Sequence, residues 1–241
     1  MSEMCRWIHH KLEVLPIINF PFDLKELPEN GIYFFYEKGE DVDHGDGLGS
    51  RIVRIGTHKD GNFRTKIAEH FLLNESKMHF SSLDSKPADR SILRKNIGRA
   101  LLSKNKDEYL EIWNIDFISR DARMEKGYQR DMVKERKIES QVTEILREMF
   151  NFRFIVLEEE MKRIGSRGLE NKLIGTVANC SVCKHSDNWL GIYSPIPKIR
   201  SGKLWLSQHI DSHEISSEDQ QKLSEVISNT EKWIQAQLND K

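Results

Sequence analysis

Two short apolar runs separated by a Gly- and Asp-rich connector constrain this fold more than any other feature of the chain. Residues 31–36 and 51–55 are rich in Ile, Val, Phe and Tyr, the residue types that favour strands. The connector at 38–50 has acidic residues at alternate positions, but their spacing does not fit a calcium-binding loop, so we expect a solvated hairpin loop. The two runs therefore predict a pair of adjacent strands.

A helical pattern follows the second run. Phe63, Ile67 and Phe71 recur at one-turn spacing, which predicts the buried side of a helix. The other positions leave two cations and an imidazole free to point elsewhere, close to a strand that carries a tyrosine. This combination suits a polyanionic substrate better than a small neutral one. These polar residues are Tyr33, Arg64, Lys66 and His70.

Three pieces of this region together resemble the signature of the GIY-YIG nuclease superfamily. They are Gly-Ile-Tyr at 31–33, Arg-Ile-Gly at 54–56, and the basic helix that contains His70 and Phe71. Such short motifs gain weight from the strand, strand, helix context in which they occur. The resemblance implies cleavage of DNA phosphodiesters with one divalent metal ion.

Two positions depart from the family pattern. Arg54 stands where the family usually has a tyrosine, so one hydroxyl is replaced by a positive charge. Lys66 stands where the family typically has an arginine, and Arg64 is the alternative for that role. The resemblance implies that one of these two cations holds the scissile phosphate, while Tyr33 relays the proton of the attacking water and His70 assists.

The third strand and the metal ligand are expected in the second half of the chain. Residues 152–158 form a short apolar run rich in strand formers, and a helical pattern with Glu170 in its first turn follows. The resemblance implies that Glu170 holds Mg²⁺ or Mn²⁺, and that Asn179 after this helix is the family's asparagine. A glutamate in a first turn is also favoured by the helix dipole, so a structural role is the alternative. The implied catalytic set is Tyr33, Arg54, Arg64, Lys66, His70, Glu170 and Asn179.

A further helix is predicted over 91–102, with an apolar side facing inward and three cations facing outward. Three exposed cations near a phosphate-binding site favour contact with a DNA backbone. An ordinary solvated face is the alternative, because 31% of the chain is charged. The three cations are Arg94, Lys95 and Arg99.

The region 107–150 is too long and too charged for a normal connection, so we expect a helical insertion into the core. Residues 109–117 suit a strand or a short amphipathic piece, and the helix 133–149 follows. Glu139 on that helix is a competing carboxylate, with an expected structural role. The preceding polar stretch at 72–88 is expected to be a surface loop.

The cysteines allow a second kind of metal site. Cys180 and Cys183 form a CxxC pair, which is half of a zinc site, and His209 and His213 could complete it. Cys5 is remote in the sequence, and the adjacent histidines near it point apart. Two reduced thiols at a helix end are the alternative that we favour.

Composition sets the outer limits. The 241 residues include 37 basic and 38 acidic side chains, so any DNA surface must be a local patch. Three cysteines, an odd number, favour a reducing compartment over a disulfide framework. The sequence shows no apolar run long enough for a membrane span and no secretory signal, so we expect a cytoplasmic protein.

These patterns predict an α+β fold with a small mixed or antiparallel sheet flanked by helices. We expect a lead-in at 1–28, a nuclease core at 29–185 and a C-terminal extension at 186–241 packed on the core or on a second copy. A metal-dependent DNA endonuclease is the leading function. A catalytically impaired nucleic-acid-binding module and a zinc-stabilised interaction protein are the alternatives, and a homodimer stays open.

Overall fold

The computed structural model describes residues 3–45, 47–58, 61–72, 91–157 and 168–239, so most of the loop expected at 72–88 lies outside the described residues. Its centre is a four-stranded antiparallel sheet with the order β1-β4-β2-β3. Strand β2 lies inside the sheet, and β3 forms one edge. The strands are β1 (Ile18–Asn19), β2 (Gly31–Asp43), β3 (Leu48–His58) and β4 (Phe150–Val156).

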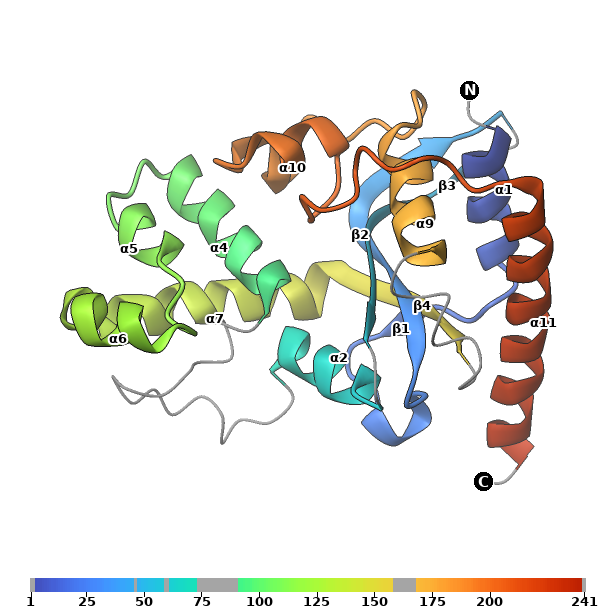
Figure 1. The fold of residues 1–241 in the computed structure, drawn as a ribbon, viewed down its shortest axis with the longest axis horizontal. Coiled ribbons are helices and arrows are strands. Elements are labelled where there is room, and N and C mark those ends of the chain that lie inside the picture. Colours follow the sequence, from blue (N-terminus) through green and yellow to red (C-terminus); the bar gives the residue numbers. More distant parts are fainter. Residues whose placement is uncertain (1–2, 46, 59–60, 73–90, 158–167, 240–241) are drawn as a thin grey trace.

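Helices cover both faces of the sheet, which confirms the predicted α+β class (Figure 1). Helices α1, α9 and α11 pack on one face, and α2, α4 and α7 lie on the other. The helices are α1 (Glu3–Leu12), α2 (Phe63–Phe71), α4 (Ile92–Lys104), α5 (Leu110–Asn114), α6 (Arg120–Lys126), α7 (Met132–Met149), α9 (Leu169–Ala178), α10 (Pro197–Gly202) and α11 (Ser217–Asn239). Short 3-10 turns occur at Leu24–Glu26, Gly127–Gln129 and Leu190–Tyr193.

Strand β2 is buried on both faces because its successive side chains point to opposite sides of the sheet. Ile32 and Phe34 join the apolar cluster beneath α1, α9 and α11. Tyr33 and Phe35 join the cluster beneath α2, α4 and α7. A run that is apolar at every position therefore reflects a central strand covered by two helical layers.

The hairpin connector differs from the solvated loop that the sequence predicts. Strand β2 continues to Asp43 and β3 begins at Leu48, so most of residues 38–50 belong to the ladder. Glu40 is buried and accepts two hydrogen bonds from the Arg51 guanidinium, at 2.5 and 3.1 Å. His44 is buried as well. Glu40 and His44 thus lie inside the fold, while Lys38, Asp41 and Asp43 of the connector are exposed, a division that composition alone did not reveal.

The region 107–150 is helical, as expected, but part of it belongs to the core. Residues 110–114 form α5 and not a strand. Helix α7 begins one residue before the predicted start, and its Val142 and Leu146 share one apolar cluster with Phe35 of β2. The segment that the sequence suggests as an insertion thus supplies a wall of the main core.

The C-terminal segment packs on the sheet. The Trp205 amide donates to the Val53 carbonyl at 2.7 Å, so this segment covers the edge strand β3. Helix α11 contacts β4 and α1, which brings both described ends of the chain to the same side of the molecule (Figure 1). None of the helices within the described ranges combines the length and the apolar character that a bilayer span needs.

Candidate active site

A pocket of about 360 Å³ lies at the β3 edge of the sheet and gathers side chains from five elements. Strands β2 and β3 supply Tyr33 and Arg54, and helices α2 and α9 supply Lys66 and Glu170. Helix α4 adds two more polar residues. Tyr33 and Glu170, which are 137 positions apart, line the same pocket, so the two halves of the site meet where a substrate can reach both. The contributions from α4 are Asn96 and Arg99.

The Tyr33 hydroxyl belongs to a buried hydrogen-bonded chain. It lies 3.1 Å from His70 Nε2, and His70 Nδ1 lies 2.7 Å from Ser91 Oγ. Ser91 is the N-cap of α4, where its Oγ accepts from the Arg94 amide. His70 is fully buried and is not among the described residues that line the pocket, but its imidazole contacts Tyr33, which does line it.

Gly56 of the second motif leaves room for this phenol. Tyr33 and Gly56 are cross-strand partners, and a Cβ built on Gly56 would lie 2.3 Å from the Tyr33 hydroxyl oxygen. Real Cβ atoms do not approach another atom that closely. The glycine is therefore required because the tyrosine ring lies across the β3 backbone.

Glu170 reaches the pocket from the opposite face of the sheet. It lies in the first turn of α9, and its Oε1 accepts a hydrogen bond from the Thr57 amide of β3 at 3.1 Å. Because β3 is the edge strand, a side chain from that layer can extend past it. Glu170 is the one carboxylate among the described residues that line this pocket, and a hard oxygen donor of this kind fits Mg²⁺ or Mn²⁺.

Two buried donors in the pocket have no acceptor within the described part of the chain. Arg54 donates through Nη1 to the Trp205 carbonyl at 2.5 Å, but its Nε is without a partner. Asn96 is 1% exposed, and its Nδ2 is also without a partner. A buried donor that lacks an acceptor costs about 1–3 kcal/mol, so a ligand with acceptor oxygens would be favoured here.

The cations exceed the anions along this pocket. Arg99 donates to the side-chain oxygens of Asn96 and Asn114, both at 2.8 Å, and neither of these partners carries a charge to balance its own. Burial lowers the pKa of Arg99 from its usual range, although a guanidinium stays charged at neutral pH. Lys66 pairs with Glu69 at 3.0 Å. The described lining therefore offers three cationic side chains against Glu170, an arrangement suited to a polyanion.

Comparison with known families identifies the fold. A family model described as the GIY-YIG domain matches residues 22–233. The chain belongs to the GIY-YIG domain family. Searches of curated proteins and of solved structures returned no match. The matched range includes the predicted C-terminal extension as far as residue 233, which agrees with the packing of that segment on β3.

Two residues of the implied GIY-YIG set lie away from the pocket. Arg64 donates through Nε to the Leu27 carbonyl at 2.6 Å and is not among the lining residues, so Lys66 is the cation that α2 places there. Asn179 is an exposed C-cap of α9, and its Nδ2 lies 3.3 Å from the Ile210 carbonyl. Asn96 lines the pocket in place of Asn179, and no motif in the sequence points to it.

The prediction that Arg94 and Lys95 face outward is wrong. Arg94 is fully buried and forms an ion pair with Glu139 at 2.5 Å, while Lys95 is 5% exposed and donates to the Ile115 carbonyl. Neither side chain lines the pocket, whereas Arg99 does. The three cations look alike in the sequence because the α7 partner that buries Arg94 lies 45 positions away.

The zinc partners suggested by the sequence are also not observed together. His209 lines the active-site pocket, and neither His209 nor His213 belongs to the group of metal-ligating side chains found among the described residues. Cys5, which sequence distance seemed to exclude, has its Sγ 3.5 Å from Cys183 Sγ. Long-range packing thus separates His209 and His213 from Cys183 and brings Cys5 to it.

Proposed function

We propose that this GIY-YIG protein is an endonuclease that hydrolyses DNA phosphodiester bonds with one Mg²⁺ or Mn²⁺ ion. Family membership supports a nuclease-type function. The observation that carries the proposal is the pocket that joins Tyr33 and Glu170 with Arg54, Lys66 and Arg99. A phosphodiester backbone provides acceptor oxygens and negative charge, which are the features that these side chains recognise.

Glu170 would hold the ion, because it supplies a hard carboxylate oxygen next to the three cations. A divalent ion bound there would polarise the phosphate and stabilise the leaving oxygen. The Thr57 amide holds Glu170 Oε1, so the carboxylate is oriented by the backbone of the edge strand. A single carboxylate is sufficient when water and substrate oxygens complete the coordination.

Tyr33 is the proposed proton relay. When the His70 proton is on Nδ1 and is donated to Ser91, His70 Nε2 has a lone pair that accepts the Tyr33 hydroxyl proton. The phenol oxygen can then accept a proton from the attacking water. In this scheme Tyr33 touches the reacting atoms, and His70 is a positioning residue that acts through it.

Arg54, Asn96 and Arg99 are the proposed phosphate-binding residues. The unpartnered donors Arg54 Nε and Asn96 Nδ2 would each gain an acceptor when a phosphate enters. Arg54 replaces the usual tyrosine of the second motif, so the site exchanges a hydroxyl for a stronger, charged donor. Substrate charge would offset the excess of cations around the pocket.

Cleavage of supercoiled plasmid DNA tests this function. We expect the wild-type protein to give nicked or linear product with Mg²⁺. We expect Glu170→Gln to keep the wild-type fold but to cleave at least about 100-fold more slowly. Tyr33→Phe keeps the ring and removes the hydroxyl, so we expect a loss of about 10²–10⁴-fold. Glu148→Gln and Tyr128→Phe change exposed residues outside the pocket and serve as matched controls. Full cleavage by Glu170→Gln would contradict the proposal.

A nucleic-acid-binding module without cleavage is the second candidate, because Arg54 replaces a catalytic hydroxyl of the family pattern. It predicts DNA binding by the wild type with no product under any divalent ion. Arg54→Tyr separates the two cases: in an endonuclease we expect weaker binding and slower cleavage, whereas a binding module would gain cleavage when the hydroxyl is restored.

A further inference from the structure

Five thiol and imidazole side chains converge at a second place, outside the active-site pocket. Cys5 and His9 come from α1, His44 follows the end of β2, and Cys180 and Cys183 lie in the loop after α9. All five are buried. The ligand atoms of Cys5, His9, His44 and Cys183 lie within 4.8 Å of one another, although their positions span almost 180 residues.

The distances among these atoms match the edges of a metal-centred tetrahedron. With Zn–S near 2.3 Å and Zn–N near 2.0–2.1 Å, tetrahedral geometry places two sulfurs about 3.8 Å apart and sulfur and nitrogen about 3.6 Å apart. Cys5 Sγ lies 3.5 Å from Cys183 Sγ, and Cys183 Sγ lies 3.6 Å from His44 Nε2 and 4.0 Å from His9 Nε2. An ion could occupy the centre with small side-chain movements.

The histidine contacts favour nitrogen ligation by His9. His9 Nδ1 lies 2.9 Å from the Cys5 carbonyl, an acceptor only, so Nδ1 carries the proton. Nε2 consequently has the lone pair, which accepts a long hydrogen bond of 3.4 Å from the Ile52 amide, and an ion would take the place of this weak donor. A backbone carbonyl that fixes the tautomer of a ligating histidine is a common feature of metal sites.

His44 provides an independent indication. Its side chain is 4% exposed, and Nδ1 has no hydrogen-bond partner within the described ranges. Its Nε2 has only the weak contact with the Cys183 thiol to compensate for burial. A metal ion would give this buried imidazole a strong interaction that the protein atoms alone do not supply.

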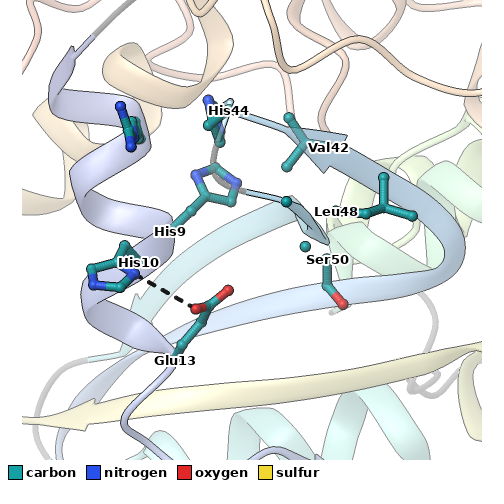
Figure 2. Close-up of a pocket in the computed structure, with 10 residues that line it drawn as sticks. His9, His10, Glu13, Val42, His44, Leu48 and Ser50 are labelled. Atoms are coloured by element: carbon teal, nitrogen blue, oxygen red, sulfur yellow. Dashed lines mark ion pairs between the residues drawn. The ribbon is translucent and has the colours of Figure 1, made fainter.

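A surface pocket gives the cluster access to solvent. Its volume is about 270 Å³, and both His9 and His44 line it. Figure 2 shows the His9 and His44 rings near each other, while His10 is turned toward Glu13. An ion can therefore reach the two imidazoles from outside, and the neighbouring His10 is not a fifth ligand.

We propose that Cys5, His9, His44 and Cys183 bind a structural Zn²⁺ ion that joins α1, the β2–β3 hairpin and the loop after α9. The two ligand thiols lose their protons to solvent on binding, so two thiolates balance the charge of the ion. The Cys180 thiol is buried in the same loop as Cys183 but is not one of the four converging ligands. The four-coordinate set leaves no open position, which is typical of a structural zinc site.

Metal analysis of protein purified without added zinc tests the site. We expect about one zinc per chain, and loss of at least half of it in Cys183→Ser and His44→Ala. His10→Ala is the matched control, because His10 is exposed beside His9 and we expect it to keep full zinc. Glu170→Gln is also expected to keep zinc, which separates this site from the proposed catalytic ion. Full zinc in both ligand variants would overturn the assignment.

A test on the wild-type protein avoids the possibility that a substituted protein fails to fold. Cobalt added after zinc removal is expected to give thiolate charge-transfer bands and the d–d bands of a tetrahedral site. X-ray absorption at the zinc edge is expected to show two sulfur and two nitrogen ligands. Zinc removal is expected to lower Tm by roughly 10 °C. A zinc-free protein with no cobalt bands, or one with a Cys5–Cys183 disulfide, would overturn the proposal.

Discussion

At the scale of single residues, the site depends on atoms that approach closely and on groups held in unusual environments. Gly56 leaves space for the Tyr33 hydroxyl, and Arg54 and Asn96 keep donors without acceptors. Glu37 is a further case outside the site, because burial raises the pKa of its carboxyl to about 7 and nearby Glu40 adds to the effect. These features were not visible from residue types alone.

Gly56→Ala tests the close approach of the Tyr33 ring to the backbone of residue 56. The new methyl must displace the Tyr33 ring, so we expect a loss of about 1–3 kcal/mol in stability and a large loss of cleavage. Gly49→Ala in the same strand is the control, because its Cβ would lie 3.3 Å from the end of the flexible Glu13 side chain and in ordinary contact with the Val42 carbonyl at 4.0 Å. In a Tyr33→Ala background we expect Gly56→Ala to cost less free energy of unfolding. Urea unfolding of the wild type, the two single variants and the double variant measures this difference. Additive losses would refute the steric explanation.

Glu37 predicts a pH dependence of stability. Its Oε2 accepts from the Trp189 and Trp205 indoles at 3.1 and 2.8 Å, which opposes the pKa increase without cancelling it. The folded carboxyl thus holds its proton between its ordinary pKa and about 7, where the unfolded chain has lost it. This group therefore makes stability fall as pH rises through that window, by roughly 1–3 kcal/mol.

Glu37→Gln removes this titration. We expect the stability of the variant relative to wild type to increase from pH 5 to pH 8, as measured by urea unfolding at each pH. The exposed Glu148→Gln is expected to follow the wild-type profile. Parallel profiles for Glu37→Gln and wild type would show that Glu37 titrates normally.

At the scale of elements, one buried guanidinium connects three helices. Arg94 of α4 contacts the Glu139 carboxylate of α7 and donates to the His70 carbonyl at the end of α2 at 2.9 Å. It also donates to Thr143 Oγ1 at 2.7 Å. The residue expected to bind DNA instead positions the helix that carries His70, and thereby the partner of Tyr33.

Arg94→Met is expected to destabilise the fold by about 3–5 kcal/mol, because the Glu139 carboxylate stays buried without its partner. Arg94→Met combined with Glu139→Leu removes both charges, so we expect it to regain a large part of that loss. Urea unfolding measures both effects. A single variant within about 0.5 kcal/mol of wild type would show that the buried pair contributes little.

At the scale of the whole molecule, the C-terminal third completes the core. Residues 204–227 supply apolar side chains to the cluster beneath α1 and α9, and Trp205 covers the β3 edge. Without them, β3 would expose an unpaired edge beside the active site. The predicted core at 29–185 and the predicted extension at 186–241 thus contribute side chains to the same apolar clusters. The contributing residues are Leu204, Leu206, Ile210, Ile215, Leu223, Val226 and Ile227.

A chain that ends after residue 185 tests this point. We expect it to aggregate or to lack a cooperative unfolding transition, because it loses seven buried apolar side chains from the cluster beneath α1 and α9 and three more from the cluster beneath α2, α4 and α7. A chain that ends after residue 235 loses only exposed positions among those described, and we expect it to keep the wild-type transition. Size-exclusion chromatography and circular dichroism compare the two. A folded monomer from the shorter chain would contradict the shared core.

The sequence by itself determined the local elements and their order. Alternating or continuous apolar runs predicted β2, β3 and β4, and the motif around Gly31 and Gly56 identified the family. Helical spacing predicted α7 and α9 with small errors at their ends. Each of these signals depends on neighbours within a few positions, so a single sequence contains it in full.

Tertiary structure alone decided which side chains meet. It buried Arg94 against Glu139, placed Lys66 and not Arg64 in the pocket, and moved Cys5 beside Cys183. A helix sequence shows that a cation faces away from its own apolar side, but not what packs against the remaining surface. That depends on segments tens to hundreds of positions away, whose arrangement is fixed only when both faces of the sheet are covered.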